Sequence, residues 1–187
     1  MSDRQLTSLA DRGVIGIRFN LSTHGMSQFV APGVERLLAR VKEMGWLLQV
    51  HYEKDELVEA APILRRAGVR VMVDHFGRPD VASGLAHPGF QTLLELGRTG
   101  NAVVKLSGPS ARRWRGIPTA TSTRSSRRPS RRSPSTAASG APTGPFVRID
   151  QRMDYGPPLV CLQRWLPDPA DRRTVLWDTP ARLFGLG

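Results

Sequence analysis

Arginine, asparagine and histidine side chains stand at the ends of short apolar runs in this sequence. The first run carries Arg18 and Asn20, the second ends at His51, and the third is followed by His75 and Arg78. A histidine moves protons or ligates a metal, and an arginine binds a carboxylate through two parallel hydrogen bonds. This combination predicts a site for a small anionic molecule.

The elements that must position these side chains alternate between strands and helices from residue 13 to residue 106. Strands are predicted at the apolar runs, and helices are predicted where apolar residues recur every three or four positions. The strands are expected at 14–21, 46–52, 69–73 and 103–106, and the helices near 34–44, 55–67 and 90–96. The run at 69–73 is apolar on nearly every residue, which is typical of a parallel strand buried on both faces. The alternation predicts an α/β protein.

Glycine and proline mark the ends of these helices. Pro32 suits the first turn of the first helix, and Gly45 its C-terminal stop. Asp55 is a plausible N-cap for the second helix, and Gly68 ends it. Pro62 inside this helix predicts a kink or a break.

The loops that follow parallel strands line one shared face, so the polar side chains at the strand ends should meet there. Lys105 and Ser107 on the fourth strand would join them. A hydrogen-bonded structural role is the stronger interpretation for His51 taken alone. For His75, between Asp74 and Arg78 on one short loop, a catalytic and a structural role both stay open.

Other charged residues have plainer interpretations. Arg18 could be a surface charge at a strand end, and Lys105 a surface charge or the partner of a nearby acid. Asp74 could simply cap its loop. His24 and His87 lie in loops beside glycine or proline, which favours structural roles for both.

The net charge of +11 is concentrated in residues 110–144, which hold eight arginines and no aspartate, glutamate or lysine. This segment is rich in serine, proline and alanine, and it buries too little apolar surface to offset the entropy of ordering. We expect it to be disordered, between residues 1–109 and 145–187 of one fold. An alternative function is nucleic-acid binding through this segment, but Trp114 is its only aromatic residue, so the binding should be non-specific.

Composition limits the class of protein further. The chain has 187 residues, of which 40% are hydrophobic, enough for a globular core. A single cysteine, Cys161, excludes an internal disulfide framework and a cysteine-rich zinc module. Residues 1–11 are polar, unlike a signal peptide or a spanning helix. These features predict a cytoplasmic protein without membrane contact and leave its oligomeric state open.

Five motifs follow one another along the chain and together span about 140 of the 187 residues. They are Gly-Ile-Arg-Phe-Asn-Leu at 16–21, Leu-Gln-Val-His at 48–51, Val-Asp-His-Phe-Gly-Arg-Pro at 73–79, Lys-Leu-Ser-Gly at 105–108 and Asp-Thr-Pro-Ala-Arg-Leu-Phe-Gly at 178–185. Together they resemble amidohydrolase family 2, a group of TIM-barrel hydrolases. The resemblance implies a partial (β/α)8 barrel of about five βα units, interrupted by the basic segment.

The resemblance also implies a reaction, in which activated water attacks the carbonyl carbon of a small carboxylated lactone, ester or amide. It makes His75 a catalytic residue and a tentative metal ligand, with His51 beside it, and it makes Arg18, Asn20 and Arg78 substrate-binding residues. Intact relatives would use a divalent metal such as zinc, whereas we expect none to be bound by this chain.

Two departures from the family pattern predict that this chain is truncated and inactive. The family carries His-x-His on its first strand, and no His-x-His occurs in these 187 residues. It ends its last strand with Gly-Ser-Asp-Trp-Pro, where residues 140–144 read Gly-Ala-Pro-Thr-Gly. If the codons are read one base earlier, this stretch permits Trp-Gly-Ser-Asp-Trp directly before Pro145. We therefore hypothesise that residues 110–144 are frame-shifted.

Overall fold

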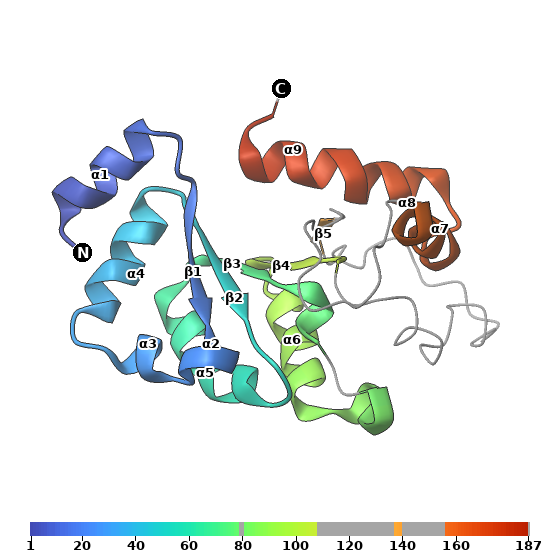
Figure 1. The fold of residues 1–187 in the computed structure, drawn as a ribbon, viewed down its shortest axis with the longest axis horizontal. Coiled ribbons are helices and arrows are strands. Elements are labelled where there is room, and N and C mark those ends of the chain that lie inside the picture. The colour runs from blue at the N-terminus through green and yellow to red at the C-terminus, as the bar shows by residue number, and fades with distance from the viewer. Residues whose placement is uncertain (79–80, 108–136, 140–155, 187) are drawn as a thin grey trace.

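The computed structural model describes residues 1–78, 81–107, 137–139 and 156–186 (Figure 1). They form a mixed α/β fold around one sheet, whose strands pair in the order β1-β2-β3-β4-β5 and are all parallel. The strands are β1 (Gly16–Asn20), β2 (Leu47–His51), β3 (Arg70–Val73), β4 (Ala102–Lys105) and β5 (Ala137–Ser139). A sequential parallel order is typical of a barrel rather than of a doubly wound sheet.

Helices connect the strands and follow the last of them. The α-helices are α1 (Asp3–Asp11), α2 (Leu21–His24), α3 (Ser27–Val30), α4 (Val34–Glu43), α5 (Glu56–Ala67), α6 (Pro88–Arg98), α7 (Gly156–Trp165), α8 (Pro169–Arg173) and α9 (Thr179–Phe184). Two 3-10 segments, η1 (His75–Gly77) and η2 (Val81–Ala86), follow β3, and a π-helical turn, η5 (Thr174–Asp178), joins α8 to α9. None of the helices in the described part of the chain combines the length and apolar character that crossing a membrane requires.

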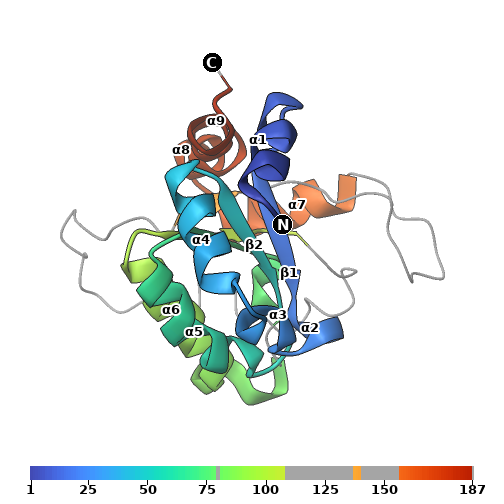
Figure 2. The same ribbon diagram turned by 90° about the vertical axis from the view of Figure 1, so that its left-hand side faces the viewer.

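Helices α4, α5 and α6 lie along the outer face of the sheet and bury the main core there (Figure 2). Their amphipathic faces supply apolar side chains at the helical spacing that the sequence predicts. The strands contribute every second residue to this core, because successive side chains point to opposite faces. Its members include Phe19, Leu48, Val50, Val71 and Val73 from the strands and Leu38, Val41, Leu57, Leu64, Leu93 and Leu96 from the helices.

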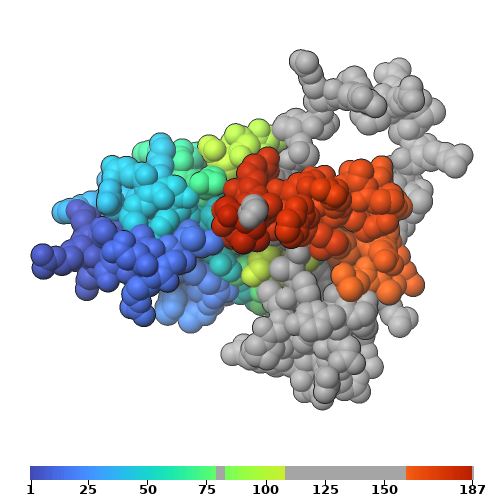
Figure 3. Space-filling view, turned by 90° about the horizontal axis from the view of Figure 1, so that it is seen from above, coloured from blue at the N-terminus to red at the C-terminus, as the bar shows by residue number. Residues whose placement is uncertain are grey.

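The inner face of the sheet has a small apolar layer of its own. Leu47, Met72 and Val103 are buried there, and Leu183 and Phe184 of α9 pack against them. The C-terminal helices therefore cover part of this face, and they reach the surface beside the N-terminal elements in Figure 3. The strong burial of β3 on both faces confirms the prediction drawn from its apolar sequence.

The four predicted strands and three predicted helices are present, with boundaries shifted by a few residues. Gly45 and Gly68 stand at the predicted helix ends. Asp168 caps α8 through a 2.8 Å hydrogen bond from the Ala170 N–H. Helix α1, which begins with a capping box between Ser2 and Gln5, was not predicted.

Two expectations about proline need correction, and the expectation about the cap of α5 holds for the position of the residue only. Pro32 precedes α4 rather than opening it, because Gly33 adopts a left-handed conformation immediately before the helix. Pro62 does not break α5. Pro62 and Val58, the residue whose carbonyl loses its helical partner, are both exposed, so water can satisfy that carbonyl. Asp55 is the N-cap residue of α5, as predicted, but its side chain accepts no hydrogen bond within the helix and binds the Gly89 N–H instead.

The prediction of disorder over 110–144 does not hold at Ala137–Ser139, which form β5. Backbone pairing with β4 holds this strand, and such pairing does not depend on an apolar side-chain pattern. Residues 110–136 and 140–144 lie outside the described residues.

Candidate active site

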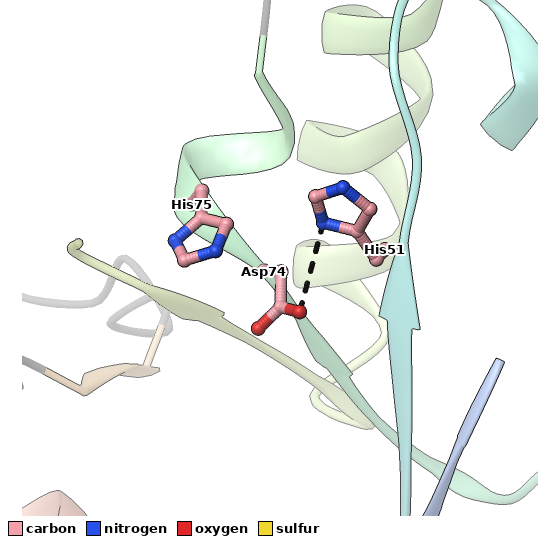
Figure 4. A group of neighbouring side chains, drawn as sticks. All are labelled: His51, Asp74 and His75. Atoms are coloured by element: carbon pink, nitrogen blue, oxygen red, sulfur yellow. Dashed lines mark ion pairs between the residues drawn. The ribbon is translucent and has the colours of Figure 1, made fainter. Parts of the chain in front are cut away.

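The polar side chains predicted to meet lie at the C-terminal end of the sheet's inner face. Strand register brings them together, because Arg18 pairs with Gln49 in the adjacent strand and Asn20 pairs with His51. Laterally paired residues of a parallel sheet point to the same face. Asp74 follows β3 directly, and Figure 4 shows its carboxylate below the rings of His51 and His75.

The Asp74 carboxylate is the centre of this cluster. Its side chain is only 2% exposed. Arg18 donates two hydrogen bonds to Oδ2, from Nε at 3.1 Å and Nη2 at 2.8 Å, and Gln49 Nε2 donates one to Oδ1 at 2.7 Å. Burial would raise the pKa of Asp74, but the bond from Arg18 and the positive charge of Lys105 outweigh it and leave the pKa below its usual value. Asp74 is therefore an anion at neutral pH.

Lys105 and His51 complete the surroundings of this carboxylate. Lys105 Nζ lies 3.6 Å from Oδ1 of Asp74, and its side chain is largely buried. His51 Nδ1 lies 3.7 Å from Oδ2 and has no hydrogen-bond partner among the described residues. Burial, and then the charge of Arg18, lower the pKa of His51 below its usual value, so the ring is neutral at pH 7.

His75 is oriented from β4. Its Nδ1 lies 3.0 Å from the hydroxyl oxygen of the buried Ser107, a hydrogen-bonding distance. Its ring meets that of His51 edge to face, with centroids 5.7 Å apart. Burial lowers the pKa of His75, the charges of Lys105 and Arg78 lower it further, and Asp74 opposes them. Two neutral imidazoles thus lie above one carboxylate.

The loop that carries His75 has an unusual backbone. His75, Phe76 and Arg78 have φ values of +50°, +57° and +40°, in the left-handed region that costs a non-glycine residue about 1–3 kcal/mol. The loop is held from two sides. The Phe76 ring packs edge to face on Trp165 of α7 at 5.3 Å. A Cβ at Gly77 would overlap the hydroxyl of the buried Tyr52, so only glycine fits there.

Arg78 forms an ion pair with Glu53, which lies in the loop after β2. Both side chains are partly exposed, at 32% and 43% respectively. The Glu53 N–H donates to the Glu56 carboxylate at 2.9 Å, which ties this loop to the start of α5. The two arginines of the cluster are therefore paired with carboxylates of very different burial.

Asn20 extends the inner face beyond Arg18. Its side-chain oxygen Oδ1 is buried and has no hydrogen-bond partner among the described residues. Its backbone N–H donates to the Gln28 side chain at 2.7 Å. The free oxygen is an acceptor available to water or to a bound molecule.

The structure gathers Arg18, Asn20, His51, His75 and Arg78 at one end of the sheet. Arg18 is not a plain surface charge, since Asp74 holds it. Asp74 does not cap its loop, because its oxygens face Arg18 and Gln49 instead. Of the two interpretations of Lys105, partner of an acid is correct.

Gln49 and Glu53 were not predicted as site residues. Ser107 was predicted to lie among the polar side chains, but its contact with His75 was not predicted. Gln49 precedes His51 by two residues, so the period of a strand would have placed both on one face. Ser107 and Glu53 meet their partners across strands and loops, which no local pattern encodes. His24 is exposed, and His87 lies at the start of α6 with Nδ1 3.5 Å from Asp55.

His51, Asp74 and His75 each offer one atom that could ligate a metal, and these atoms lie within 4.8 Å of one another. The unpartnered Nδ1 of His51 favours a ligand there. The surroundings oppose a cation, because the oxygens of Asp74 already accept three hydrogen bonds and two positive side chains, Arg18 and Lys105, lie beside them. The donor set therefore fits a resident metal poorly.

Comparison with known proteins identifies related sequences over most of the chain. The Amidohydrolase family model matches residues 1–139. A 4-sulfomuconolactone hydrolase from Rhizobium radiobacter is 29% identical, over 100% of this chain and 63% of its own length. A 2-pyrone-4,6-dicarboxylate hydrolase from Comamonas testosteroni is 31% identical over 52% of this chain and 32% of its own. The chain thus spans less than two thirds of the length of these relatives.

Solved structures show the same fold. A probable 2-pyrone-4,6-dicarboxylic acid hydrolase from Acinetobacter baumannii, with citric acid bound, superimposes with a TM-score of 0.78 at 21% identity, covering 100% of this chain and 70% of its own. An amidohydrolase from Burkholderia multivorans with bound zinc gives a TM-score of 0.72 at 17% identity, with the same coverage.

Proposed function

Because the chain belongs to the amidohydrolase family, we propose that its site recognises small lactones carrying carboxylate groups. The observation that carries the proposal is the meeting of Arg18, Lys105 and Arg78 with two neutral histidines at the C-terminal end of the sheet. Two carboxylates, Asp74 and Glu53, offset these three positive charges only in part. The remaining positive charge favours an anion over a cation. The names of the relatives, hydrolases of an anionic lactone and of a pyrone dicarboxylate, support the same class of ligand.

Each group in the cluster has a part in binding such a molecule. Arg78 and the exposed part of Arg18 offer N–H donors to carboxylate oxygens, and Asn20 Oδ1 accepts a hydrogen bond from a hydroxyl or from water. Ser107 engages Nδ1 of His75, which leaves its other ring nitrogen, Nε2, to exchange a proton with the ligand or with water. Since the pKa of His75 is lowered, this nitrogen is a proton acceptor at neutral pH when Nδ1 carries the proton.

Hydrolysis in this family then requires water to form a bond to the lactone carbonyl carbon while the ring C–O bond breaks. The proton from water goes to a base, and the leaving oxygen takes up a proton. The acid that the family resemblance places before Pro145 is missing from residues 140–144. This polypeptide therefore binds the lactone but does not hydrolyse it.

The site works without a resident metal in this proposal. Placing a divalent cation against Asp74 would displace the hydrogen bonds from Arg18 and Gln49 and would set the ion close to Lys105. The electrostatic cost of that placement supports anion recognition instead. Zinc is present in the amidohydrolase from Burkholderia multivorans, where the surrounding chain is longer.

Isothermal titration of the 187-residue chain with 2-pyrone-4,6-dicarboxylate, paired with an absorbance assay for ring opening, tests the proposal. We expect saturable binding and no turnover, with and without added zinc. Absence of binding would contradict the ligand class. Ring opening at a rate above that of buffer would contradict the predicted inactivity.

Resequencing the gene tests why the acid is missing. In the frame-shift hypothesis, resequencing through the codons for residues 110–144 recovers Gly-Ser-Asp-Trp-Pro in the alternative frame. Introducing that sequence should restore the base to the chain. Independent DNA that confirms the printed frame at both junctions would reject a sequencing error as its origin.

A further inference from the structure

Two ion pairs at the site have the same chemistry but very different exposure. In the first, Arg18 binds Asp74, whose carboxylate is 2% exposed and also accepts a hydrogen bond from Gln49. In the second, Arg78 binds Glu53, and both side chains reach solvent. A ligand carboxylate cannot displace Asp74 without breaking several buried bonds, whereas Glu53 can rotate into water.

We propose that Glu53 is an internal competitor that occupies Arg78 until a substrate carboxylate replaces it. The inference rests on the proposed function, since it takes Arg78 as a binding group for an anionic ligand. A glutamate carboxylate and a substrate carboxylate present the same two oxygens to a guanidinium, so they compete for one set of donors. Glu53 is thus a residue that sets affinity and selectivity without touching the reacting atoms.

The geometry gives this competition a fixed location. Arg78 is held in a left-handed backbone conformation at the end of the strained loop, with its N–H donating to the His75 carbonyl at 2.9 Å. Its charge is near enough to lower the pKa of both His51 and His75. The loop thus fixes the backbone position of Arg78, whichever carboxylate binds its side chain.

Competition also selects among ligands. A ligand with one weakly basic anion would have to replace a tethered carboxylate, which has the advantage of a high effective concentration. A ligand with two or three carboxylates gains other contacts, with Arg18 for example, that offset the loss of Glu53. Glu53 therefore favours polycarboxylates over monoanions.

The test compares Glu53→Gln with the wild-type chain in titrations with 2-pyrone-4,6-dicarboxylate. Removing an exposed ion pair frees Arg78, so we expect the variant to bind about two- to fivefold more tightly. A gain in affinity cannot come from misfolding. Glu59→Gln on the exposed face of α5 is the matched control, because it removes the same charge from a residue with no ion pair among the described residues, and its affinity should stay unchanged.

A double-mutant cycle makes the assignment specific to Arg78. In the Arg78→Gln background, Glu53→Gln should have no effect on affinity. Wild-type binding without tighter binding by Glu53→Gln, or an equal gain in Glu59→Gln, would overturn the competitor role and leave the proposed function standing. Binding by Glu53→Gln but not by wild type would support the inference, and binding by neither would overturn both.

Discussion

The inner face of the sheet carries two layers built from the same strands. Leu47, Met72 and Val103 form an apolar layer that α9 covers, and Gln49, Asp74 and Lys105 lie two residues further along the same three chain segments. Side chains two residues apart in a strand point to the same face, so the polar layer follows the same strand register as the apolar layer. Strand register therefore sets the spacing of the charges in the site, independently of how the apolar layer packs.

The two layers respond differently to the loss of one member. An apolar side chain gains stability through burial, and its removal leaves a cavity that neighbours fill only in part. A buried charge is stable only because its partners satisfy it, so removing one charge leaves the others unpaired. Substitutions in the two layers should thus separate stability from ligand binding.

Met72→Ala, in the apolar layer, is expected to have the largest effect. The side chain is 5% exposed and contacts the layer beneath α9, so the truncation should lower the free energy of unfolding by about 3 kcal/mol. Urea denaturation measures this loss. Affinity for 2-pyrone-4,6-dicarboxylate, measured where the variant is still folded, should change by less than about twofold. A fall in affinity that parallels the fall in stability would show that the layers do not act separately.

Asp74→Asn, in the polar layer, should cost about 2 kcal/mol of unfolding free energy. The substitution keeps the shape of the side chain but removes the charge that Arg18 and Lys105 share. Asp3→Asn is the control, because Asp3 pairs with Arg36 on the surface, where both side chains are mostly exposed. That change should cost less than about 1 kcal/mol. Equal losses in the two variants would mean that burial of Asp74 adds nothing to its ion pair.

The sequence was sufficient for the strands, the three outer helices and the end of the sheet where polar side chains gather. The spacing of apolar residues and the glycines at helix ends encode these features locally, as at Gly45 and Gly68. The partners within the site were not predictable in the same way. Whether Asp74 capped its loop or bound Arg18 depends on residues 56 positions apart, which only strand register brings together.

Segments with weak local patterns were the other source of error. The Ala137–Ser139 strand has no apolar alternation, and its place in the sheet depends on the edge offered by β4. Glu53 has no distinguishing neighbour in the sequence, and its ion pair with Arg78 depends on the loops after β2 and β3 lying side by side. Pairing between distant segments, rather than composition, decides such cases.

Stability should fall as the pH drops below about 6.5, the ordinary pKa of histidine. His51 and His75 have lowered pKa values in the fold, so below pH 6.5 the unfolded chain takes up protons that the folded chain does not. The lowered pKa of Asp74 acts at more acid pH, since its stabilisation is lost only as the pH falls through its folded value. Urea denaturation at pH 7.5 and 5.5 measures the difference. It should shrink in His51→Gln and persist in His24→Gln, because His24 is exposed; a pH response unaltered in His51→Gln would place its source elsewhere.

Ser107→Ala tests the smallest contribution, the hydrogen bond that orients His75. Losing one buried hydrogen bond should cost about 1 kcal/mol of unfolding free energy. The sharper readout is the His75 ring, because the alanine variant no longer has a hydroxyl at Nδ1 to fix one tautomer. Nitrogen-15 NMR of labelled histidine should show a single tautomer in the wild type and a mixture in Ser107→Ala, while the exposed His24 stays unchanged. If His75 keeps one tautomer without Ser107, the polar layer beneath it, and Asp74 above all, sets the ring's orientation instead.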